Sequence, residues 1–136
     1  MAEPTYLLDT NILSDLIKHP AGVVAQHIAR VGESTVCTSI VVACELRYGC
    51  AKKGSAALSE KIEQLLSMMD VLPLEVDADR EYGMIRGALE KIGTTIGAND
   101  MLIAAHALSQ NLTLITGSLS EFSRINGLKL ENWLKP

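Results

Sequence analysis

The chain has 136 residues, of which 48% are hydrophobic and 21% are charged, and its formal net charge is −4 at pH 7. This length and composition predict one globular domain over residues 1–136 and exclude a disordered chain. No stretch reaches the roughly 20 apolar residues of a membrane helix, and residues 1–4 lack the basic start of a secretion signal, so we expect a cytoplasmic protein that does not enter a membrane.

Strand and helix patterns alternate along the chain. The apolar or β-branched runs typical of strands lie at residues 4–8, 34–38, 71–74, 112–116 and 128–130. Segments with a helical spacing of apolar residues lie at 11–18, 20–31, 40–50, 56–69, 77–91 and 100–110. This order predicts a three-layer α/β/α sandwich with a mainly parallel sheet, in which a site is expected at the carboxyl ends of the strands.

Single residues indicate where several elements begin or lie. Asp9 directly follows the first strand in a polar cluster typical of a helix start. Pro20 is typical of a first helical position, so we expect the second helix to begin there. Pro73 cannot donate a backbone hydrogen bond and therefore predicts an edge strand, and Asn99 is expected to cap the helix over residues 100–110.

The helix over residues 40–50 is apolar on nearly every face, so we expect it to be deeply buried. Two of the three cysteines, Cys44 and Cys50, lie in this helix, and Cys37 precedes it. The cysteines are odd in number and have no Cys-x-x-Cys spacing. We therefore expect reduced core residues rather than disulfides or a zinc site.

Glu45 lies in the middle of this apolar helix. An ionised carboxylate that is buried without a partner is very costly, so Glu45 must be paired, protonated or bound to a metal ion. A salt bridge to a buried arginine, such as Arg47 or Arg86, is the structural alternative. Metal binding or catalysis is the functional one.

Asp9 and Asp100 each have a structural interpretation as well. Asp9 at a strand end can cap the following helix, and Asp100 in a first helical turn is favoured by the helix dipole. With Glu45, however, these residues place three acids at strand ends or on buried helix faces of one domain, with no lysine close in sequence. Converging carboxylates repel one another unless a cation joins them, and hard oxygen ligands suit Mg²⁺ or Mn²⁺.

Other catalytic patterns do not match. The sequence has no Gly-x-Gly-x-x-Gly, no Gly-x-x-x-x-Gly-Lys-Ser/Thr and no Gly-x-Ser-x-Gly. A haloacid-dehalogenase phosphatase needs Asp-x-Asp after its first strand, where this chain has Asp9-Thr10-Asn11. A receiver domain needs its acceptor aspartate directly after the third strand, where this chain has Leu74-Glu75. The three histidines are scattered, and we expect a packing or surface role for His106.

The chain resembles the PIN-domain ribonuclease toxins of bacterial toxin–antitoxin modules, the VapC-like group, over essentially its whole length. The ordered set of segments and their spacing are specific to that group, although each segment alone is a weak pattern. The matching segments are residues 7–13, 38–49, 96–107, 114–122 and 125–133.

This resemblance implies a PIN-like fold and a metal centre formed by Asp9, Glu45 and Asp100, with Mg²⁺ or Mn²⁺ as the ion. It also implies endonucleolytic hydrolysis of structured RNA such as tRNA by metal-activated water, which leaves 5′-phosphate and 3′-hydroxyl ends. The implied partners are a cognate antitoxin, operator DNA through that antitoxin, and a second copy of the chain. Possible polar groups around the ligands are Thr10, Asn11, Ser39 and Ser118.

Ser118 departs from the family pattern, which usually has an acid or an asparagine at this position. A serine adds no charge, so we expect weak metal affinity, with a single ion bound before RNA arrives and any second ion recruited with the phosphate. The alternative is that Ser118 caps the short helix at residues 119–122, with Glu121 as its capping-box partner. The departure also keeps open a second function, a catalytically weak or inactive module that acts through its antitoxin and operator DNA.

The charge balance and the apolar content concern partners. Without the three proposed ligands the chain has 13 acidic residues against 12 basic ones, so the net charge argues only weakly against RNA. The helices over residues 20–31 and 40–69 carry more apolar positions than one sheet needs, which favours a homodimer and a groove for the antitoxin. Candidates for contacting the RNA backbone are Lys18, Arg47, Lys52, Lys53, Arg80 and Arg86.

Overall fold

The computed structural model describes residues 3–136, so the expectation about the start of the chain falls partly outside it. Five strands form one sheet in the order β3-β2-β1-β4-β5, and every neighbouring pair is parallel. The strands are β1 (Tyr6–Leu8), β2 (Val36–Ser39), β3 (Asp70–Leu72), β4 (Thr113–Ile115) and β5 (Leu130–Glu131). The predicted α/β class with a parallel sheet is confirmed.

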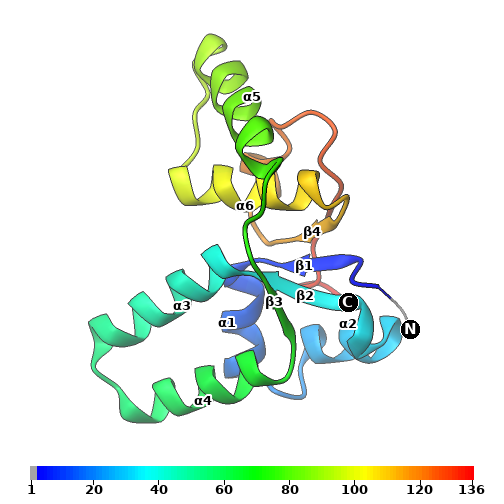
Figure 1. The fold of residues 1–136 in the computed structure, drawn as a ribbon. Coiled ribbons are helices and arrows are strands. Elements are labelled where there is room, and N and C mark those ends of the chain that lie inside the picture. The colour runs from blue at the N-terminus through cyan, green and yellow to red at the C-terminus, as the bar shows by residue number, and fades with distance from the viewer. Residues whose placement is uncertain (1–2) are drawn as a thin grey trace.

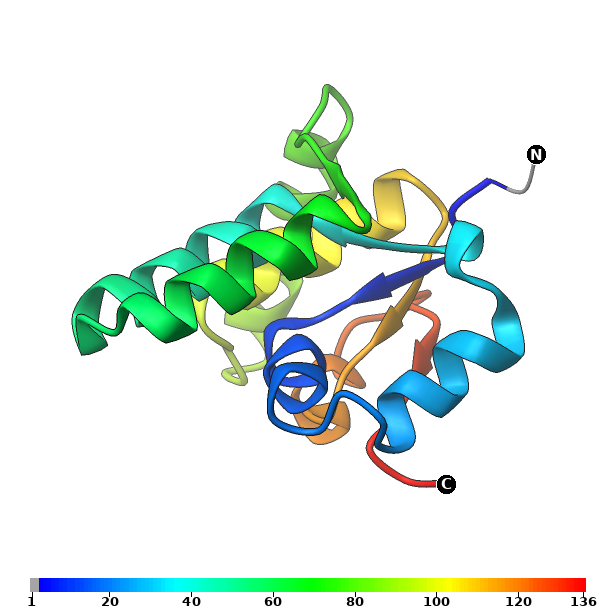
Figure 2. The same cartoon turned by 90° about the horizontal axis from the view of Figure 1, so that it is seen from below.

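Helices flank this sheet. Figure 1 shows α5 and α6 above the strands and α1 and α2 below them, and in Figures 1 and 2 the α3–α4 hairpin projects to one side. The helices are α1 (Thr10–Lys18), α2 (Val23–Val31), α3 (Ile40–Lys53), α4 (Ala56–Ser67), α5 (Ala78–Lys91), α6 (Ala98–Ser109) and α7 (Leu119–Phe122), with a 3₁₀ turn at Glu33–Thr35. No helix in the described residues is both long and apolar enough to cross a bilayer.

The central strand β1 determines where a site can form. Leu7 and Leu8 are fully buried, since β1 pairs with β2 on one side and β4 on the other and is covered by helices. Asp9 follows β1 directly, at the middle of the sheet's carboxyl edge. Parallel strands all end at this edge, so the loops after β1, β2 and β4 approach one another there.

Several predicted boundaries were wrong. Pro20 lies in a turn and α2 begins only at Val23, after the cap residue Gly22. Asn99 lies inside α6, which begins at Ala98 with Gly97 as its cap. In both cases the helix start follows the glycine, which shows that capping residues chosen by type alone are weak markers. The edge position predicted from Pro73 was right, because β3 is an edge strand and Pro73 directly follows it.

The expectation that the helix after β2 is deeply buried was wrong. Val42 and Leu46 on α3 are buried, but Ile40 and Tyr48 are 42% and 68% exposed, and Cys44 is exposed as well. Cys37 and Cys50 are buried, as predicted, and all three cysteines are free. The helix projects beyond the sheet with α4, so one apolar stripe lacks a covering layer in this chain.

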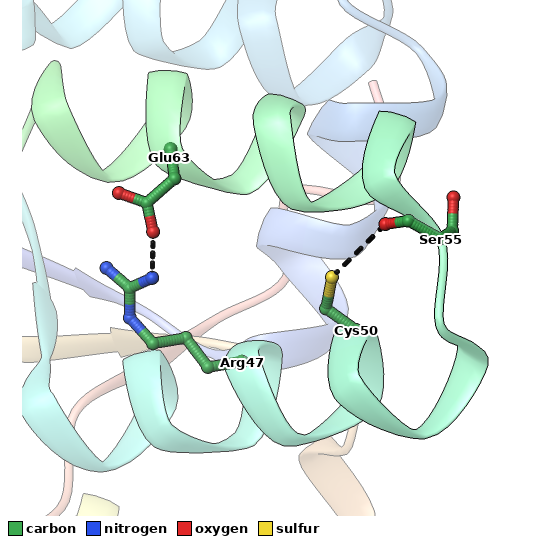
Figure 3. A network of polar contacts seen from close by, with 4 residues as sticks. All are labelled: Arg47, Cys50, Ser55 and Glu63. Atoms are coloured by element: carbon green, nitrogen blue, oxygen red, sulfur yellow. Dashed lines mark hydrogen bonds and ion pairs between the residues drawn. The ribbon is translucent and has the colours of Figure 1, made fainter.

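Two polar contacts join α3 to α4 in this hairpin (Figure 3). The Arg47 guanidinium forms an ion pair with the Glu63 carboxylate, and both side chains are more than half exposed. Near the turn, the Cys50 thiol donates to the Ser55 carbonyl oxygen over 3.6 Å. The two helices of the hairpin are therefore held together by these polar contacts and by the packing of the buried Ile62 and Leu66 side chains.

Candidate active site

Asp9, Glu45 and Asp100 line one cavity of about 480 Å³. Asp9 follows β1, Glu45 lies on α3, and Asp100 lies in the first turn of α6. The fold thus brings Asp9 and Asp100, which are far apart in sequence, into one cavity at the carboxyl edge of the sheet. The lining residues are Asp9, Thr10, Asn11, Ser14, Asp15, Lys18, Glu45, Asp100, Ser118 and Leu134.

Asp9 is buried and is bound on both carboxylate oxygens. The Thr10 backbone N–H donates to Oδ1 and the Thr116 hydroxyl donates to Oδ2, each over 2.8 Å. Burial raises the pKa of Asp9, while these two hydrogen bonds oppose the rise. Asp9 therefore caps α1, as the structural interpretation predicted, and also faces the cavity.

Glu45 is half-buried and does not form either of the predicted salt bridges. Arg47 pairs with Glu63, and Arg86 pairs with Glu90 and receives no contact from Glu45. Instead the Thr10 hydroxyl donates to Glu45 Oε1 over 2.5 Å. Thr10 therefore links two carboxylates, Asp9 through its backbone and Glu45 through its side chain.

The carboxyl group of Asp100 has a strongly raised pKa. Burial, followed by the negative charges of Asp9, Glu45 and Glu121, raises the pKa of Asp100 to about 6. Charges of the same sign within a partly desolvated pocket favour the protonated form. Such a shift marks a group that is held in an unfavourable environment, which is typical of functional sites.

The donor set suits a hard divalent cation. Among the described residues, none of the three carboxylates forms an ion pair with Lys, Arg or His. Burial first, and then the negative charges of neighbouring acids, raise the pKa values of Asp9 and Asp100. Within residues 3–136, no three His, Cys, Asp or Glu side chains are already placed to hold one ion. Binding by all three carboxylates therefore requires these side chains to approach one another more closely than they do in this structure.

Of the four polar residues named as possible neighbours of the ligands, three line the cavity: Thr10, Asn11 and Ser118. The Asn11 amide accepts from the Gly117 backbone N–H over 3.1 Å and donates to the Ser118 hydroxyl over 3.2 Å, which ties α1 to the loop after β4. Ser118 occupies the cap position of α7, but its side chain makes no capping bond, so the capping box with Glu121 is not formed.

Ser39 lies elsewhere. It is fully buried at the end of β2, and its hydroxyl caps α3 through the Val41 N–H and contacts His106 Nδ1 at 2.7 Å. His106 is also fully buried, in line with the expected packing role, and burial lowers the pKa of its imidazole. This pair joins α6 to the start of α3, the two helices that carry Asp100 and Glu45.

Sequence reasoning did not identify every side chain at the cavity. Lys18 was already among the candidates for contacting RNA, but Ser14 and Asp15 were missed. These two residues follow Asn11 by three and four positions on one face of α1, and this helical spacing would have indicated them. One buried carboxylate oxygen of Asp15 has no hydrogen-bond partner. Thr116 and Leu134 reach the site only through the tertiary fold.

Comparisons with known proteins agree with this architecture. The PIN domain family model matches residues 6–128. Ribonuclease VapC2 of Rickettsia felis is 39% identical over 132 residues, which cover 96% of this chain and 98% of the relative. The tRNA(fMet)-specific endonuclease VapC of Shigella flexneri is 34% identical, with 94% and 97% covered. A crystal structure of VapBC2 from Rickettsia felis bound to a promoter DNA fragment matches with a TM-score of 0.88, at 34% identity, over 95% of this chain and 98% of that one.

Proposed function

Because this chain belongs to the PIN-domain family, we propose that it is a divalent-metal-dependent endoribonuclease and the toxin of a toxin–antitoxin pair. The observation that carries the proposal is the convergence of Asp9, Glu45 and Asp100 on one cavity, with none of the three in an ion pair within residues 3–136. The similarity to proteins named as VapC ribonucleases, over nearly the full length of both chains, supports the same class of reaction.

The three carboxylates would hold Mg²⁺ or Mn²⁺. Such an ion supplies the positive charge that activates water and offsets the charge that develops during phosphodiester hydrolysis. The chain's own residues prepare the site for it. Thr116 and the backbone of Thr10 orient Asp9, the hydroxyl of Thr10 orients Glu45, and burial with mutual repulsion makes the ionised acids costly until a cation is present.

RNA is the substrate that we propose, with tRNA as the leading candidate. Lys18 lines the acidic cavity, and Lys18 and Lys53 both line an adjoining cavity of about 240 Å³ between α1, α3 and α4. These lysines lie where a phosphate backbone leaving the acidic cavity would pass. Arg47 and Arg86 are weaker candidates, since each already pairs with an acid on the surface.

Its partners in this proposal are an antitoxin, operator DNA through that antitoxin, and a second copy of the chain, all in the cytoplasm. Large apolar side chains remain exposed on the hairpin and on α5, among them Tyr48 at 68%, Met84 at 70% and Ile92 at 66%. Exposed apolar surface of this kind marks interfaces with other proteins. Light scattering at micromolar concentration tests the dimer, and co-purification with the product of an adjacent gene tests the antitoxin.

The decisive experiment incubates the purified protein with total RNA and with Mg²⁺, with Mn²⁺ or with EDTA. We expect cleavage with either ion, no cleavage with EDTA, and 5′-phosphate ends on the products. Asp9→Asn and Asp100→Asn should remove cleavage and leave the fold intact by circular dichroism. Asp79→Asn on the exposed start of α5 is the matched control and should cleave like the wild type. Equal cleavage by all four proteins would refute the assignment.

A second function is favoured by one observation. Ser118 brings only a hydroxyl to the cavity, and this hydroxyl already accepts from Asn11, so the site has one charge fewer than a four-acid centre. A module with little or no catalysis would still bind its antitoxin and, through it, operator DNA. Absence of RNA cleavage under every metal condition, together with antitoxin binding, would establish this alternative.

A further inference from the structure

Leu134 is the one apolar side chain among the ten that line the acidic cavity. It lies in the segment after β5, far in sequence from all three acids, and it is half-buried against the core. The other lining groups are carboxylates, hydroxyls, one amide and one ammonium. Leu134 therefore gives an otherwise polar cavity one apolar wall.

The segment that carries Leu134 is fastened to α2. The Trp133 side chain is 1% exposed, and its ring stacks on His27 with centroids 5.3 Å apart and planes 8° apart. His27 Nε2 lies 2.9 Å from the Lys135 carbonyl oxygen, so the residues on both sides of Leu134 are attached to the same histidine. Figures 1 and 2 show the end of the chain beside α2.

Leu134 is also held from the cavity side. A Cβ atom built on Gly117 would lie 2.7 Å from Leu134 Cδ1, so this leucine packs directly on the Gly117 backbone. The Asn11 amide fixes Gly117 in turn, by accepting its N–H. Leu134 thus lies between the α2 anchor and the loop after β4, where it forms one wall of the cavity.

We infer that Leu134 packs against the face of a nucleobase next to the cleaved phosphate and thereby positions the RNA. This inference rests on the proposed function. Of the three parts of a nucleotide, phosphate and ribose are polar, and only the base offers an apolar face. Contact with a base also gains binding free energy without adding charge to a cavity that already repels phosphate.

The experiment uses the RNA fragment that the wild-type protein cleaves and two altered fragments. One altered fragment has an abasic nucleotide on the 5′ side of the cleaved bond, and the other has it on the 3′ side. Leu134→Ala keeps Trp133 and its anchor. The matched control is Leu108→Ala, a half-buried leucine on α6 that lines a different cavity. KM and kcat are measured for each protein and fragment, thermal unfolding shows that each variant is folded, and calorimetric titration with Mn²⁺ reports on the acidic centre.

We expect Leu134→Ala to raise KM for the intact fragment about tenfold, the size of effect that an apolar pocket contact has on recognition, with kcat and Mn²⁺ affinity close to wild type. One abasic fragment should raise the wild-type KM by a similar factor and have little further effect on Leu134→Ala, since both changes remove the same contact. Leu134→Met should restore most of the lost affinity.

Two outcomes would overturn the inference while leaving the proposed function in place. One is a KM for Leu134→Ala equal to that of Leu108→Ala. The other is that Leu134→Ala and the abasic nucleotide each raise KM by their full factor when the two changes are combined. Failure of the wild type to cleave any RNA would overturn both the proposed function and this inference, so the two failures are distinguishable.

Discussion

The two helices of the α3–α4 hairpin each carry a glutamate in a different environment: Glu45 of α3 lines the acidic cavity, whereas Glu63 of α4 lies on the outer surface of the hairpin. Glu63 on the hairpin is more than half exposed and pairs with Arg47. Glu45 on the neighbouring helix is half-buried and receives only the Thr10 hydroxyl, with Asp9 and Asp100 lining the same cavity. The first arrangement compensates a charge, and the second gathers charges that are not compensated.

This difference separates structural from functional charge. An exposed ion pair changes stability little, because water already solvates both groups. Burial of Asp100, followed by repulsion from the neighbouring acids, raises its pKa and thereby destabilises the metal-free fold when this group is ionised. Such a cost is expected where a site is prepared for a ligand of opposite charge.

The largest expected effect compares the two glutamates directly. Glu45→Gln should lower the rate of RNA cleavage by about a thousandfold or more, the range found when one member of a catalytic unit is removed. Glu63→Gln should leave the rate within about twofold of wild type, since its partner Arg47 lies outside the acidic cavity. Single-turnover cleavage assays provide both numbers. Similar losses of rate in the two variants would contradict the assignment of Glu45 to the active site and of Glu63 to a surface ion pair.

Ser118→Asp tests how many charges the cavity needs. A fourth carboxylate should tighten Mn²⁺ binding and lower the metal concentration for half-maximal cleavage, by about tenfold for one added ligand charge. The metal-free protein should become less stable, because the new charge joins the existing repulsion. Calorimetric titration of wild type, Ser118→Asp and Ser118→Ala measures the first effect. Unchanged metal affinity in Ser118→Asp would place residue 118 outside the metal's reach.

Asp100→Asn should stabilise the metal-free protein at neutral pH. The pKa of Asp100 is about 6 in the fold against 3.8 for an ordinary aspartate, so the folded state binds its proton more tightly than the unfolded state does. The metal-free wild type therefore loses stability as pH rises from about 4 through 6. We expect the variant to melt about 2–4 °C higher than wild type at pH 7.5, with a smaller difference at pH 4.5.

The metal supplies the control for this measurement. Mn²⁺ should raise the melting temperature of the wild type at pH 7.5, because it binds only the folded site. It should raise that of Asp100→Asn much less. Two results would contradict the destabilisation assigned to ionised Asp100. One is a wild-type melting temperature that Mn²⁺ does not change, and the other is a variant that melts below wild type without metal.

The smallest expected effect concerns the hairpin pair itself. Arg47→Met and Glu63→Gln should each shift the melting temperature by about 1 °C or less, since both side chains are more than half exposed. Scanning calorimetry at low and high salt measures the shift. A large loss in either variant would show that the hairpin depends on this pair rather than on the buried Ile62 and Leu66.

Much of the architecture could be predicted from local sequence. The alternation of strands and helices, the parallel sheet and the edge position of β3 follow from patterns that act within a few residues, such as apolar periodicity and proline chemistry. Helix starts were predicted less well. Pro20 is typical of a first helical position and Asn99 of a cap, yet Gly22 and Gly97 hold the capping positions, because the approach of the chain decides where each helix begins.

The sequence by itself determined the three acids, since a carboxylate in an apolar helix or at a strand end is unusual at the level of residue type. The tertiary structure alone decided their surroundings. Thr116 reaches Asp9 and Leu134 reaches the cavity across more than a hundred residues of chain, and Arg47 turns to Glu63 instead of Glu45. Periodicity describes only neighbours along the chain, whereas these contacts depend on which loops the parallel sheet brings to one edge.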